Sequence, residues 1–459
     1  MRDYLTWGEI LEATAGRLRR GDPEMHVQSF STDTRTLRPG DLFIALPGPN
    51  FDGHHFVLEA LRRRAIGAVV SSIEGLAVDQ AAGLLEVEDT LSALGEIASL
   101  WRRLHPVPLV AVTGSAGKTT TKEWATLLLG RRYRVLSSPG SFNNLIGLPL
   151  TLLQIRQDHQ MVVAELGTSA RGEIRRLSQI CQPDIGLITN IGAAHLEFLG
   201  SLEGVLAAKA EMLEFLGAEK TCILNGEDPY LKTLMRGVRG RCFTYGLSAE
   251  WDLWASGIVV GKEGTDFQLR CGPQEAPVHL SVWGRHNLYN VLAAAAIGVM
   301  ADLSLQEVGE ALSAIRQPPM RMEKVLLPGE AVLINDAYNA NPLSMRASLG
   351  TFFEMKGESR GILVLGDMLE LGSQGERLHR EIGAILASYN NVGALIAVGP
   401  HTGALAEEAQ RNGFSAPIFI CQDQNEASLA LRQNLRPKDW VLLKGSRAMK
   451  MEKVLEGLN

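Results

Sequence analysis

The sequence predicts an α/β protein of three domains. Its 459 residues exceed what a single hydrophobic core usually organises. Short apolar runs that end in glycine or a polar residue alternate with helical patterns, as buried parallel strands do when their carboxyl ends open onto a ligand crevice. A proline-flanked segment near residue 106 and the stretch "RQPPMR" at 316–321 interrupt this alternation. We therefore expect domains at residues 1–105, 106–317 and 318–459.

The first domain is predicted to be a small α/β unit. An amphipathic pattern indicates an opening helix, and apolar runs alternate with helical patterns after it. The expected elements are helices at residues 7–18 and 55–64 and strands at 41–46 and 67–72.

The second domain is predicted to hold a parallel sheet with a β-rich edge. Four short apolar runs come first, a β-rich stretch follows, and an Ala-rich helix and a second helix end the domain. The expected strands are 108–114, 161–167, 184–192 and 220–226, then 241–246, 251–260, 267–271 and 278–284, with helices at 290–300 and 305–315.

The third domain repeats the alternation of strands and helices, which predicts a Rossmann-like α/β unit. Its expected strands are 331–336, 361–367, 394–399 and 440–445.

Composition excludes several classes of protein. The chain is 46% hydrophobic and 21% charged with a net charge of −6, which argues against a general nucleic-acid or membrane-surface binder. Its five cysteines are scattered without a C-x-x-C spacing, which is typical of reduced thiols in a cytosolic protein. No apolar signal core opens the sequence, and no apolar run approaches membrane-spanning length. We expect a cytoplasmic monomer that neither inserts into membranes nor binds nucleic acid.

The stretch "AVTGSAGKTT" at 111–120 nearly matches a phosphate-binding loop. In the common pattern G-x-x-x-x-G-K-[ST] the first glycine would stand at Val112, whereas here it stands at Gly114. A predicted strand leads into the stretch and a predicted helix leaves it, so backbone N–H groups would surround phosphate oxygens. A glycine-rich turn without a ligand is the alternative, and the strand and helix argue against it. The residues expected at a nucleoside triphosphate are Gly114, Ser115, Ala116, Gly117, Lys118, Thr119 and Thr120.

The shortened form T-G-x-x-G-K-T-T resembles the loop of the Mur ligase superfamily, which includes the folylpolyglutamate synthetases. The resemblance implies that ATP transfers its γ-phosphate to a carboxylate. An amine would then attack the acyl phosphate and form an amide. Two Mg²⁺ ions would neutralise charge during the transfer.

Three further residues are implied around the metal. Glu165 ends a predicted strand and His195 follows another, where the crevice of a parallel sheet lies. The stretch at 190–197 resembles the family's N-x-x-x-x-H-x-[ED] pattern. Lys209 alone would be read as a surface lysine of a helix, but relatives carbamylate the lysine at this position. The resemblance thus implies Lys118, Glu165, His195 and Lys209 as catalytic residues, with Thr119, Glu165, His195 and carbamylated Lys209 as metal ligands.

Other motifs point to the far end of the nucleotide. Asn287 alone would be read as a helix cap, but residues 284–294 match the family pattern G-x-H-N-x-x-N-x-x-A-A, which implies Asn287 and Asn290 near adenine. Arg321 resembles a hinge arginine that reaches the γ-phosphate and would also be catalytic. Asp336 resembles an acid near the ribose. Since the last two belong to the third domain, catalysis should require domain closure around ATP.

The first domain resembles the uridine-diphosphate-binding domain of peptidoglycan-precursor ligases. On its own, Asp33 beside Arg35 would be read as a capped turn with a surface ion pair, but residues 31–56 match the longer signature. The resemblance implies a UDP-N-acetylmuramoyl-tripeptide as acid substrate, bound by Ser31, Thr32, Asp33, Arg35, Asn50, Asp52 and His54. Asn143, Asn144, Thr168 and Ser169 would lie near its path, although many relatives have G-A-N where Thr168 and Ser169 stand.

The third domain would select the amine. "DAYNANPLSMRASL" at 336–349 and "LGDMLELG" at 365–372 resemble the family members that add D-alanyl-D-alanine. The resemblance implies that Tyr338, Asn339, Asn341 and Ser344 contact the dipeptide. Lys444, Ser446 and Arg447 would hold its carboxylate, the lysine and arginine supplying the charge.

Three alternatives stay open on the sequence. A family member that adds a single amino acid would differ at the two motifs of the third domain. A folylpolyglutamate synthetase would begin almost at the phosphate loop, without residues 1–105. A nucleotide-dependent binding protein without catalysis would not need Glu165, His195 and Lys209 together.

Overall fold

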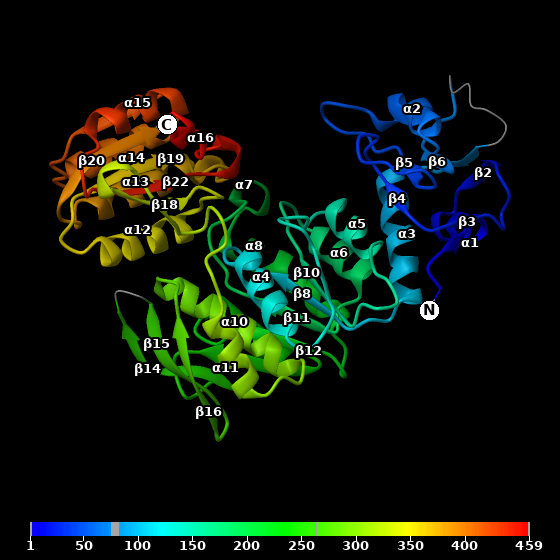
Figure 1. Ribbon diagram of the computed structural model, residues 1–459, viewed down its shortest axis with the longest axis horizontal. Helices are drawn as coiled ribbons and strands as arrows, with labels where there is room; N and C mark the ends of the chain where they lie inside the picture. The colour runs from blue at the N-terminus through cyan, green and yellow to red at the C-terminus, as the bar shows by residue number, and fades with distance from the viewer. Residues whose placement is uncertain (1, 75–81, 262–263, 458–459) are drawn as a thin grey trace.

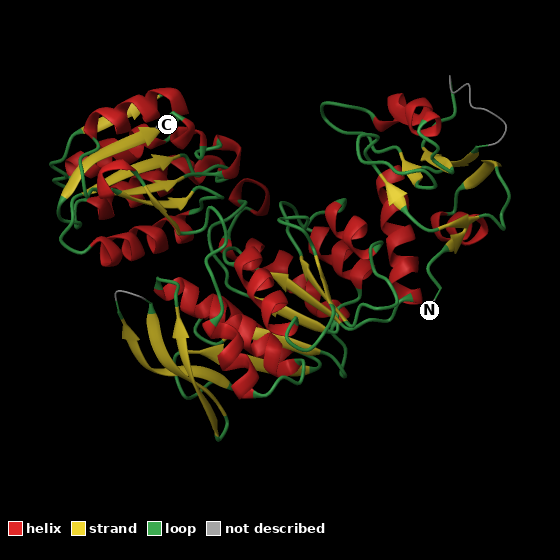
Figure 2. Ribbon diagram, viewed as in Figure 1, coloured by secondary structure: helices red, strands yellow, loops and turns green. Residues whose placement is uncertain are grey.

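The computed structural model describes residues 2–74, 82–261 and 264–457 and confirms the α/β class. Figure 1 shows three α/β bodies, with the N-terminal body (blue) and the C-terminal body (yellow to red) on opposite sides of the central one. Figure 2 shows that each body contains a sheet of strands with helices beside it.

The N-terminal body holds a five-stranded sheet in the order β2-β7-β6-β5-β4, in which β2 alone is antiparallel. The predicted opening helix is shorter than expected: it ends at Thr14, because Ala15 takes φ 49° and residues 17–20 pair with β7 instead. The elements are β1 (Leu5–Thr6), α1 (Trp7–Thr14), β2 (Arg17–Arg20), β3 (His26–Val27), β4 (Phe30–Ser31), β5 (Leu42–Ile44), α2 (Val57–Arg62), β6 (Gly67–Val70) and β7 (Gly83–Glu86).

A long helix, α3 (Thr90–Leu104), fixes this body to the central one (Figure 1). Asp89 caps its start through Leu91 N and Ser92 N. Near its end, Trp101 Nε1 donates to Ile155 O (3.1 Å) and Arg102 Nε donates to Cys181 O (2.9 Å). The sequence did not predict this helix.

The central body holds nine strands in the order β16-β15-β14-β13-β12-β11-β8-β10-β9, parallel from β9 to β14 and antiparallel from β14 to β16. This confirms the predicted parallel sheet with a β-rich edge. The last predicted strand is displaced to Gln274–Leu280, because it pairs along β15 from Cys271 back to Thr265. The strands are β8 (Leu109–Thr113), β9 (Val135–Ser137), β10 (Met161–Glu165), β11 (Ile185–Ile188), β12 (Thr221–Asn225), β13 (Arg241–Gly246), β14 (Leu253–Val260), β15 (Thr265–Cys271) and β16 (Gln274–Leu280).

Helices cover both faces of this sheet. Apolar residues of α4, α10 and α11 form one core with the sheet, and those of α3, α5, α6 and α8 form another. The helices are α4 (Lys118–Leu129), α5 (Gly147–Leu152), α6 (Glu173–Cys181), α7 (Leu196–Leu199), α8 (Leu202–Ala210), α9 (Pro229–Leu234), α10 (Arg285–Met300) and α11 (Leu305–Ser313).

The C-terminal body holds six strands in the order β17-β18-β22-β19-β20-β21, of which only β17 is antiparallel. Helices α12 to α14 pack on one core of this sheet, and α15 and α16 on the other. The elements are β17 (Glu323–Leu326), β18 (Val332–Asp336), α12 (Pro342–Lys356), β19 (Gly361–Gly366), α13 (Gly375–Leu386), β20 (Val392–Val398), α14 (Thr402–Arg411), β21 (Ile418–Cys421), α15 (Gln424–Asn434), β22 (Trp440–Lys444) and α16 (Lys453–Glu456).

The helix starts differ in a way that matters for the site. Helices α1, α11 and α12 each begin with a capping box formed by their own side chains. Helix α4 begins after Gly117 without a side-chain cap. Its first-turn N–H groups are thus left for a ligand, as at other helix N-termini that bind anions.

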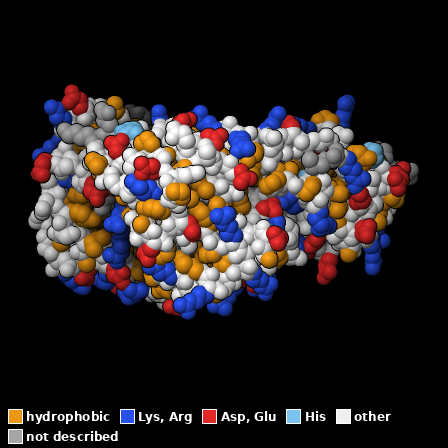
Figure 3. All heavy atoms as spheres, turned by 90° about the horizontal axis from the view of Figure 1, so that it is seen from below, with side chains coloured by type: hydrophobic (Ala, Val, Ile, Leu, Met, Phe, Trp, Pro, Cys, Tyr) orange, Lys and Arg blue, Asp and Glu red, His pale blue; other side chains and the backbone are white. Residues whose placement is uncertain are grey.

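On the face drawn in Figure 3, basic and acidic side chains are interspersed, and no large patch of one charge is seen. Of the helices in the described ranges, none combines the length and apolar character needed to cross a membrane.

Candidate active site

The phosphate loop joins β8 to α4, and its glycines stand where larger residues do not fit. Gly114 has φ 147° and Gly117 has φ 80°, both in the region that favours glycine. A Cβ atom on Gly114 would overlap Thr189 Oγ1, and one on Gly117 would overlap Asn290 Oδ1. Val112 is a buried residue of β8. Close packing of this loop therefore explains why the glycine stands at 114 and not at 112.

The segment after β11 supports the loop. Ser115 N donates to Asn190 O (3.0 Å), and Ala116 N donates to Asn190 Oδ1 (2.9 Å). Thr189 Oγ1 donates to Ala116 O (2.6 Å). Thr189 and Asn190 were not predicted as site residues. The available signal was the position of Asn190, near the polar end of an apolar run and first in the N-x-x-x-x-H pattern.

Lys118 lies at the start of α4 with its ammonium folded back over the loop. Its Nζ donates to Gly114 O at 2.8 Å. Burial lowers the pKa of Lys118; Glu165 opposes this shift and Arg321 adds to it. An anionic phosphate beside this ammonium would favour its charged form.

Glu165 is buried at the end of β10 and uses both carboxylate oxygens. Thr119 Oγ1 donates to Oε2 (2.7 Å), and Asn143 Nδ2 donates to Oε1 (2.8 Å). The sequence placed Asn143 on the path of the acid substrate, whereas its amide is directed to Glu165 here. Gly167, two residues after Glu165, leaves room for this side chain. A Cβ atom at position 167 would overlap the Asn143 amide.

Lys209 is buried in α8 with 1% of its surface exposed, so it is not a surface lysine. Burial lowers the pKa of Lys209 well below its usual value, the nearby ammonium of Lys118 lowers it further, and Glu165 opposes the shift. A lowered pKa increases the share of this lysine that is in the neutral, nucleophilic form.

His195 follows β11 with a left-handed backbone at φ 54°. Its Nδ1 lies 2.6 Å from Glu370 Oε2 of the C-terminal body, a contact that is an ion pair when the imidazole is protonated. The His195 contact also lowers the pKa of Glu370, although burial opposes that shift. Among the described residues, no three His, Cys, Asp or Glu side chains gather as a metal-binding group. A metal here would need Lys209, as its carbamate, or Thr119.

Asn287 and Asn290 are both buried near the start of α10. Asn290 Nδ2 donates to Asn287 Oδ1 (3.2 Å), and Asn287 Nδ2 donates to Trp283 O (2.8 Å). Burial lowers the pKa of His286 to about 4, with Asp336 opposing the shift and Lys444 adding to it. The histidine is therefore neutral at physiological pH.

A tyrosine and a glutamate beyond this helix start were missed by the sequence analysis. Tyr289 donates its hydroxyl to Glu227 Oε2, and both residues line the main cavity. Glu227 follows β12, and a polar residue after a strand end was the only signal for it.

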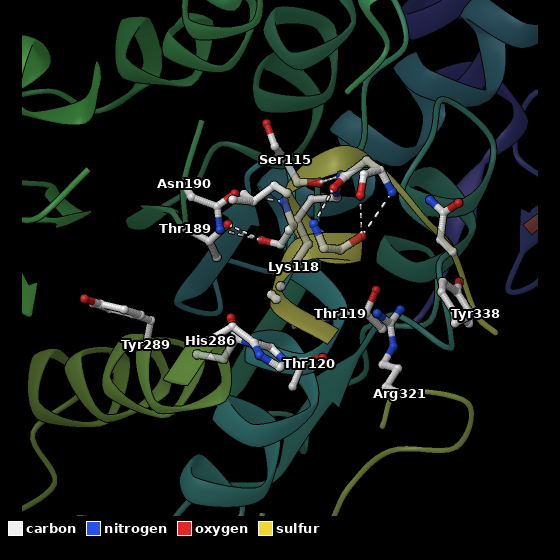
Figure 4. A pocket seen from close by; sticks show the side chains of 18 of the residues that line it. Ser115, Lys118, Thr119, Thr120, Thr189, Asn190, His286, Tyr289, Arg321 and Tyr338 are labelled. Carbon is white, nitrogen blue, oxygen red and sulfur yellow. Dashed lines mark hydrogen bonds between the residues drawn. The ribbon is translucent and has the colours of Figure 1, made fainter. Parts of the chain in front are cut away.

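Arg321 meets the site from the interdomain linker. Its guanidinium lies 3.9 Å from the ring centroid of Tyr338, within cation–π range. Figure 4 shows the two side chains beside each other. The Arg321 neighbours Met320 and Met322 have φ values of 56° and 59°. The chain thus reverses sharply on both sides of the predicted hinge arginine.

Asp336 and Lys444 form a buried pair, which the sequence analysis did not foresee. Lys444 Nζ donates to Asp336 Oδ2 at 2.6 Å and to Asn339 O at 3.0 Å. Ser348 also donates to Asp336 Oδ2, and Met322 N donates to Oδ1 (3.1 Å). The roles predicted for Asp336 at ribose and for Lys444 at a carboxylate stay predictions.

The loop at 337–341 is tied to the chain after β22 and to α12. Asn341 and Ser344 form the capping box of α12. Arg447 N donates to Asn339 Oδ1 (3.2 Å), and Ser446 Oγ donates to Ala340 O (3.2 Å). The Arg447 guanidinium remains half-exposed near the Tyr338 ring, 5.9 Å from its centroid.

Thr168 and Ser169 form a tight turn before α6. Thr168 Oγ1 donates to Ala170 O (2.6 Å), and Ser169 N donates to Glu173 Oε2 (2.6 Å). Asn144 Oδ1 accepts from Gly147 N (2.8 Å) at the start of α5. All three residues line the main cavity.

The predicted uridine-site residues lie in two segments of the N-terminal body, 31–35 and 50–54. Arg35 forms a bidentate ion pair with Asp33, and the hydrogen bonds from Arg35 lower the pKa of Asp33. His54 Nε2 accepts from Ser71 N (2.9 Å), so its Nδ1 carries the proton toward Asp52 Oδ1, 2.6 Å away. The remaining members are Ser31, which is buried, Thr32, which is half-buried, and Asn50, which is exposed.

One cavity of about 1050 Å³ is lined by predicted site residues of both the central and the C-terminal body (Figure 4). The phosphate loop, Glu165, His195 and the Asn287–Asn290 turn line it from the central body. Arg321, Asp336, Tyr338 and the 339–344 segment line it from the other side. None of the seven predicted uridine-site residues lines this cavity, so the site has two separate parts within the described chain.

Comparison with known proteins identifies this arrangement. The family described as "Mur ligase middle domain" matches residues 112–298, and "Mur ligase, glutamate ligase domain" matches residues 320–447. A UDP-N-acetylmuramoyl-tripeptide–D-alanyl-D-alanine ligase of Bacillus subtilis is 34% identical over 450 residues, which are 98% of this chain and 97% of the relative. The chain belongs to the Mur ligase family.

Solved structures of MurF are similar to this Mur ligase over nearly the whole chain. The crystal structure of MurF from Acinetobacter baumannii superimposes with a TM-score of 0.90 at 30% identity, covering 99% of this chain and 98% of the other. MurF ligase from Thermotoga maritima in complex with ADP superimposes with a TM-score of 0.82 at 26% identity, covering 94% and 97%. The folylpolyglutamate synthetase and single-amino-acid alternatives are not favoured by these relatives, and nucleotide binding by this Mur ligase is supported by the ADP complex.

Proposed function

We propose that this Mur ligase joins D-alanyl-D-alanine to UDP-N-acetylmuramoyl-tripeptide and cleaves ATP to ADP and phosphate. The observation that carries the proposal is the shared cavity. There Lys118 and Glu165 face Arg321, Tyr338 and Asn341 of the C-terminal body. The names of the Bacillus and Acinetobacter relatives point to the same reaction.

The reaction proceeds in two transfers. The terminal carboxylate of the tripeptide attacks the γ-phosphorus of ATP and ADP leaves, which gives an acyl phosphate. The amino group of D-alanyl-D-alanine then attacks the acyl carbon, phosphate leaves, and the nitrogen loses a proton. Lys118 and Arg321 balance negative charge on the transferred phosphoryl group, since fixed cations lower the barrier where charge accumulates.

Mg²⁺ is the metal that suits the donors near Lys118. We propose Thr119, Glu165, His195 and the carbamate of Lys209 as ligands for two ions. Hydroxyl and carboxylate oxygens are the donors that Mg²⁺ prefers, and burial of Lys209 beside Lys118 favours the neutral amine that carbamylation needs. When bound, the metal neutralises phosphate charge.

Each body takes one substrate in this proposal. Residues 1–105 bind the uridine diphosphate through Ser31, Thr32, Asp33, Arg35, Asn50, Asp52 and His54. Residues 106–317 bind ATP, with Asn287 and Asn290 toward adenine and Asp336 near the ribose. Residues 318–459 bind the dipeptide. The protein acts as a cytoplasmic monomer.

Arg447 is the cation best placed for the dipeptide carboxylate. Lys444 is 2% exposed and paired with Asp336 inside the protein, whereas the Arg447 side chain is 48% exposed and its ion pair with Glu452 (2.9 Å) is partly exposed to solvent. Neutralising a second carboxylate with Lys444 would require breaking a buried pair, which is costly.

ADP release tests the proposal. Wild-type protein is given ATP, Mg²⁺ and UDP-N-acetylmuramoyl tripeptides ending in either meso-diaminopimelate or lysine, with D-alanyl-D-alanine or single amino acids as the amine. We expect ADP release that depends on one of the tripeptides and on D-alanyl-D-alanine. Equal release with D-alanine would show that the enzyme adds a single amino acid.

A further inference from the structure

A buried lysine lies beside the active site, on the helix that follows the phosphate loop. Lys122 lies one turn after Lys118 on α4 and is 0% exposed. Its Nζ donates to Ser138 O at 2.6 Å and to Gly140 O at 2.8 Å, and Glu123 Oε1 lies 2.9 Å away. A buried ammonium normally requires such partners, because an unpaired one is strongly disfavoured.

The two carbonyls belong to the loop at 138–145, which connects β9 to α5. This loop forms one wall of the main cavity through Ser141, Asn143, Asn144 and Leu145. The loop also reaches Glu165 at two points: Ser138 Oγ accepts from Glu165 N (3.3 Å), and Asn143 Nδ2 donates to Glu165 Oε1 (2.8 Å).

Lys122 therefore connects two parts of the site that serve different substrates. Helix α4 carries Lys118 and Thr119, which face ATP, and the 138–145 loop forms the wall assigned to the acid substrate. The ammonium fixes the position of the loop relative to α4 through charge-assisted hydrogen bonds, which are stronger than neutral ones. A second link one turn on, from Thr126 Oγ1 to Ser137 Oγ (3.0 Å), keeps the strand before the loop in place without a charge.

We propose that Lys122 is a positioning residue for the acid substrate: it fixes the 138–145 loop against α4, so that Asn143 holds Glu165 and the loop wall is preformed. This inference rests on the proposed function for the identity of the acid substrate. Nucleotide binding does not depend on it, because the phosphate loop is supported from the other side by Thr189 and Asn190.

Lys356 offers a matched control. It is 4% exposed at the end of α12, and its Nζ donates to two backbone carbonyls, Gly357 O (3.2 Å) and Ser359 O (2.8 Å). It lines neither the main cavity nor the smaller cavity beside Trp124 and Arg316. Lys356→Met removes the same kind of buried tether at a place without a substrate.

The test compares Lys122→Met with Lys356→Met in the full chain. For Lys122→Met we expect KM for the UDP-muramoyl tripeptide to rise and kcat to fall, together by about 10- to 100-fold in kcat/KM, as for other residues that orient a ligand-holding side chain. The ATP dissociation constant should change less than about threefold, since the phosphate loop keeps its own supports. Lys356→Met should leave these constants within about twofold while lowering Tm to a similar degree.

A conservative variant, Lys122→Gln, and amide hydrogen exchange give two further readouts. Glutamine keeps an N–H donor for the carbonyls, so Lys122→Gln should recover part of the lost kcat/KM. Amide exchange in 138–145 should be faster in Lys122→Met than in wild type. If Lys122→Met does not fold, Lys122→Gln carries the test: protection of 138–145 and kcat/KM for the tripeptide should fall together, and a change in either one without the other overturns the proposal. A matching kinetic profile for Lys122→Met and Lys356→Met, or equal weakening of ATP and the tripeptide, also overturns it. An inactive wild-type protein would contradict the proposed function instead. Amide exchange in 138–145 would then still show whether Lys122 fixes the loop.

Discussion

Asn341 Nδ2 donates a hydrogen bond to Ser115 O at 3.2 Å, so the first residue before α12 touches the phosphate loop directly. The same side chain caps α12 by accepting from Ser344 N (2.8 Å). Leu343 lies against Gly192, and Glu370 contacts His195. The C-terminal body is thus in contact with the residues that would surround the γ-phosphate.

Asn341→Ala should separate capping from domain contact. Loss of the cap should cost about 1 kcal/mol of unfolding free energy. Loss of the contact to Ser115 should lower kcat/KM by roughly tenfold or more, because small displacements of positioned groups are expensive in catalysis. Ser304→Ala removes an equivalent capping box from α11, away from the cavity. Thermal unfolding and ADP release should show similar destabilisation in both variants but lost turnover only in Asn341→Ala; equal turnover would make the contact to Ser115 irrelevant.

Lys118→Ala should abolish turnover and leave binding of the UDP-muramoyl tripeptide nearly intact. The reason is the separation of the two parts of the site: Lys118 lines the main cavity, and the seven predicted uridine-site residues do not. Binding of the tripeptide can be followed by calorimetry in the absence of ATP. Comparable loss of both properties would contradict the assignment of the two substrates to different bodies.

Arg35→Ala should weaken the nucleotide–peptide substrate far more than ATP. The Arg35 side chain is 85% exposed and pairs with Asp33 as its only ion-pair partner among the described residues, so its removal should change stability little. Arg19→Ala breaks another exposed ion pair of the same body, with Glu86, and serves as control. Steady-state constants for both substrates decide the matter, and a change confined to the ATP constant would place the uridine site elsewhere.

His379 predicts a pH dependence of stability. It is 0% exposed, its Nε2 accepts from Met368 N (3.0 Å), and its Nδ1 therefore donates to Gly375 O (2.7 Å). Burial lowers the pKa of His379, although the bond to Gly375 O and Asp367 oppose this. Below its unfolded pKa of about 6.5, His379 is therefore protonated to a greater extent in the unfolded chain than in the folded one. The free energy of unfolding thus falls as the pH drops, by at most about 1.4 kcal/mol per pH unit.

His379→Gln should flatten this acid slope while lowering stability at pH 8, where the neutral imidazole keeps both hydrogen bonds. His279→Gln, which changes a half-exposed histidine paired with Asp266, should leave the slope as in wild type. Denaturant unfolding between pH 5 and 8 measures both. An acid slope that persists in His379→Gln would assign it to other groups.

The sequence predicted what is local and missed what is long-range. Strand ends such as Glu165 and Asp336 were predictable, because buried apolar runs ended in polar residues. The Asp336–Lys444 pair was not, since its partners are 108 positions apart and meet only through the pairing of β18 with β22. Similarly, the use of Asn341 and Ser344 as a capping box was hidden, because the same residue types also suit a dipeptide site.

Short elements and helix α3 show a second limit. Strand β4 has two residues and gains its place from β5 rather than from its own pattern. The start of α3 was readable from Asp89, but its packing on Ile155 and Cys181 depends on residues far along the chain. Burial of Lys209 was likewise invisible locally, because a lysine among alanines of a helix is usually at the surface.

Lys209→Ala should lose most of the ligase activity, and acetate or formate should restore part of it. The carbamate proposed at this position contributes negative charge and oxygen lone pairs, which a small carboxylate can supply in the space that the buried side chain vacates. The acyl-phosphate step should suffer most, because the charge of the γ-phosphate is balanced there. Lys232→Ala removes an exposed lysine of α9 and should change little. Bicarbonate depletion should mimic the variant in wild-type protein if the carbamate exchanges during the experiment. Loss that no anion restores would mean that Lys209 acts as a cation toward phosphate, and full activity in Lys209→Ala would leave Thr119, Glu165 and His195 as the proposed ligands.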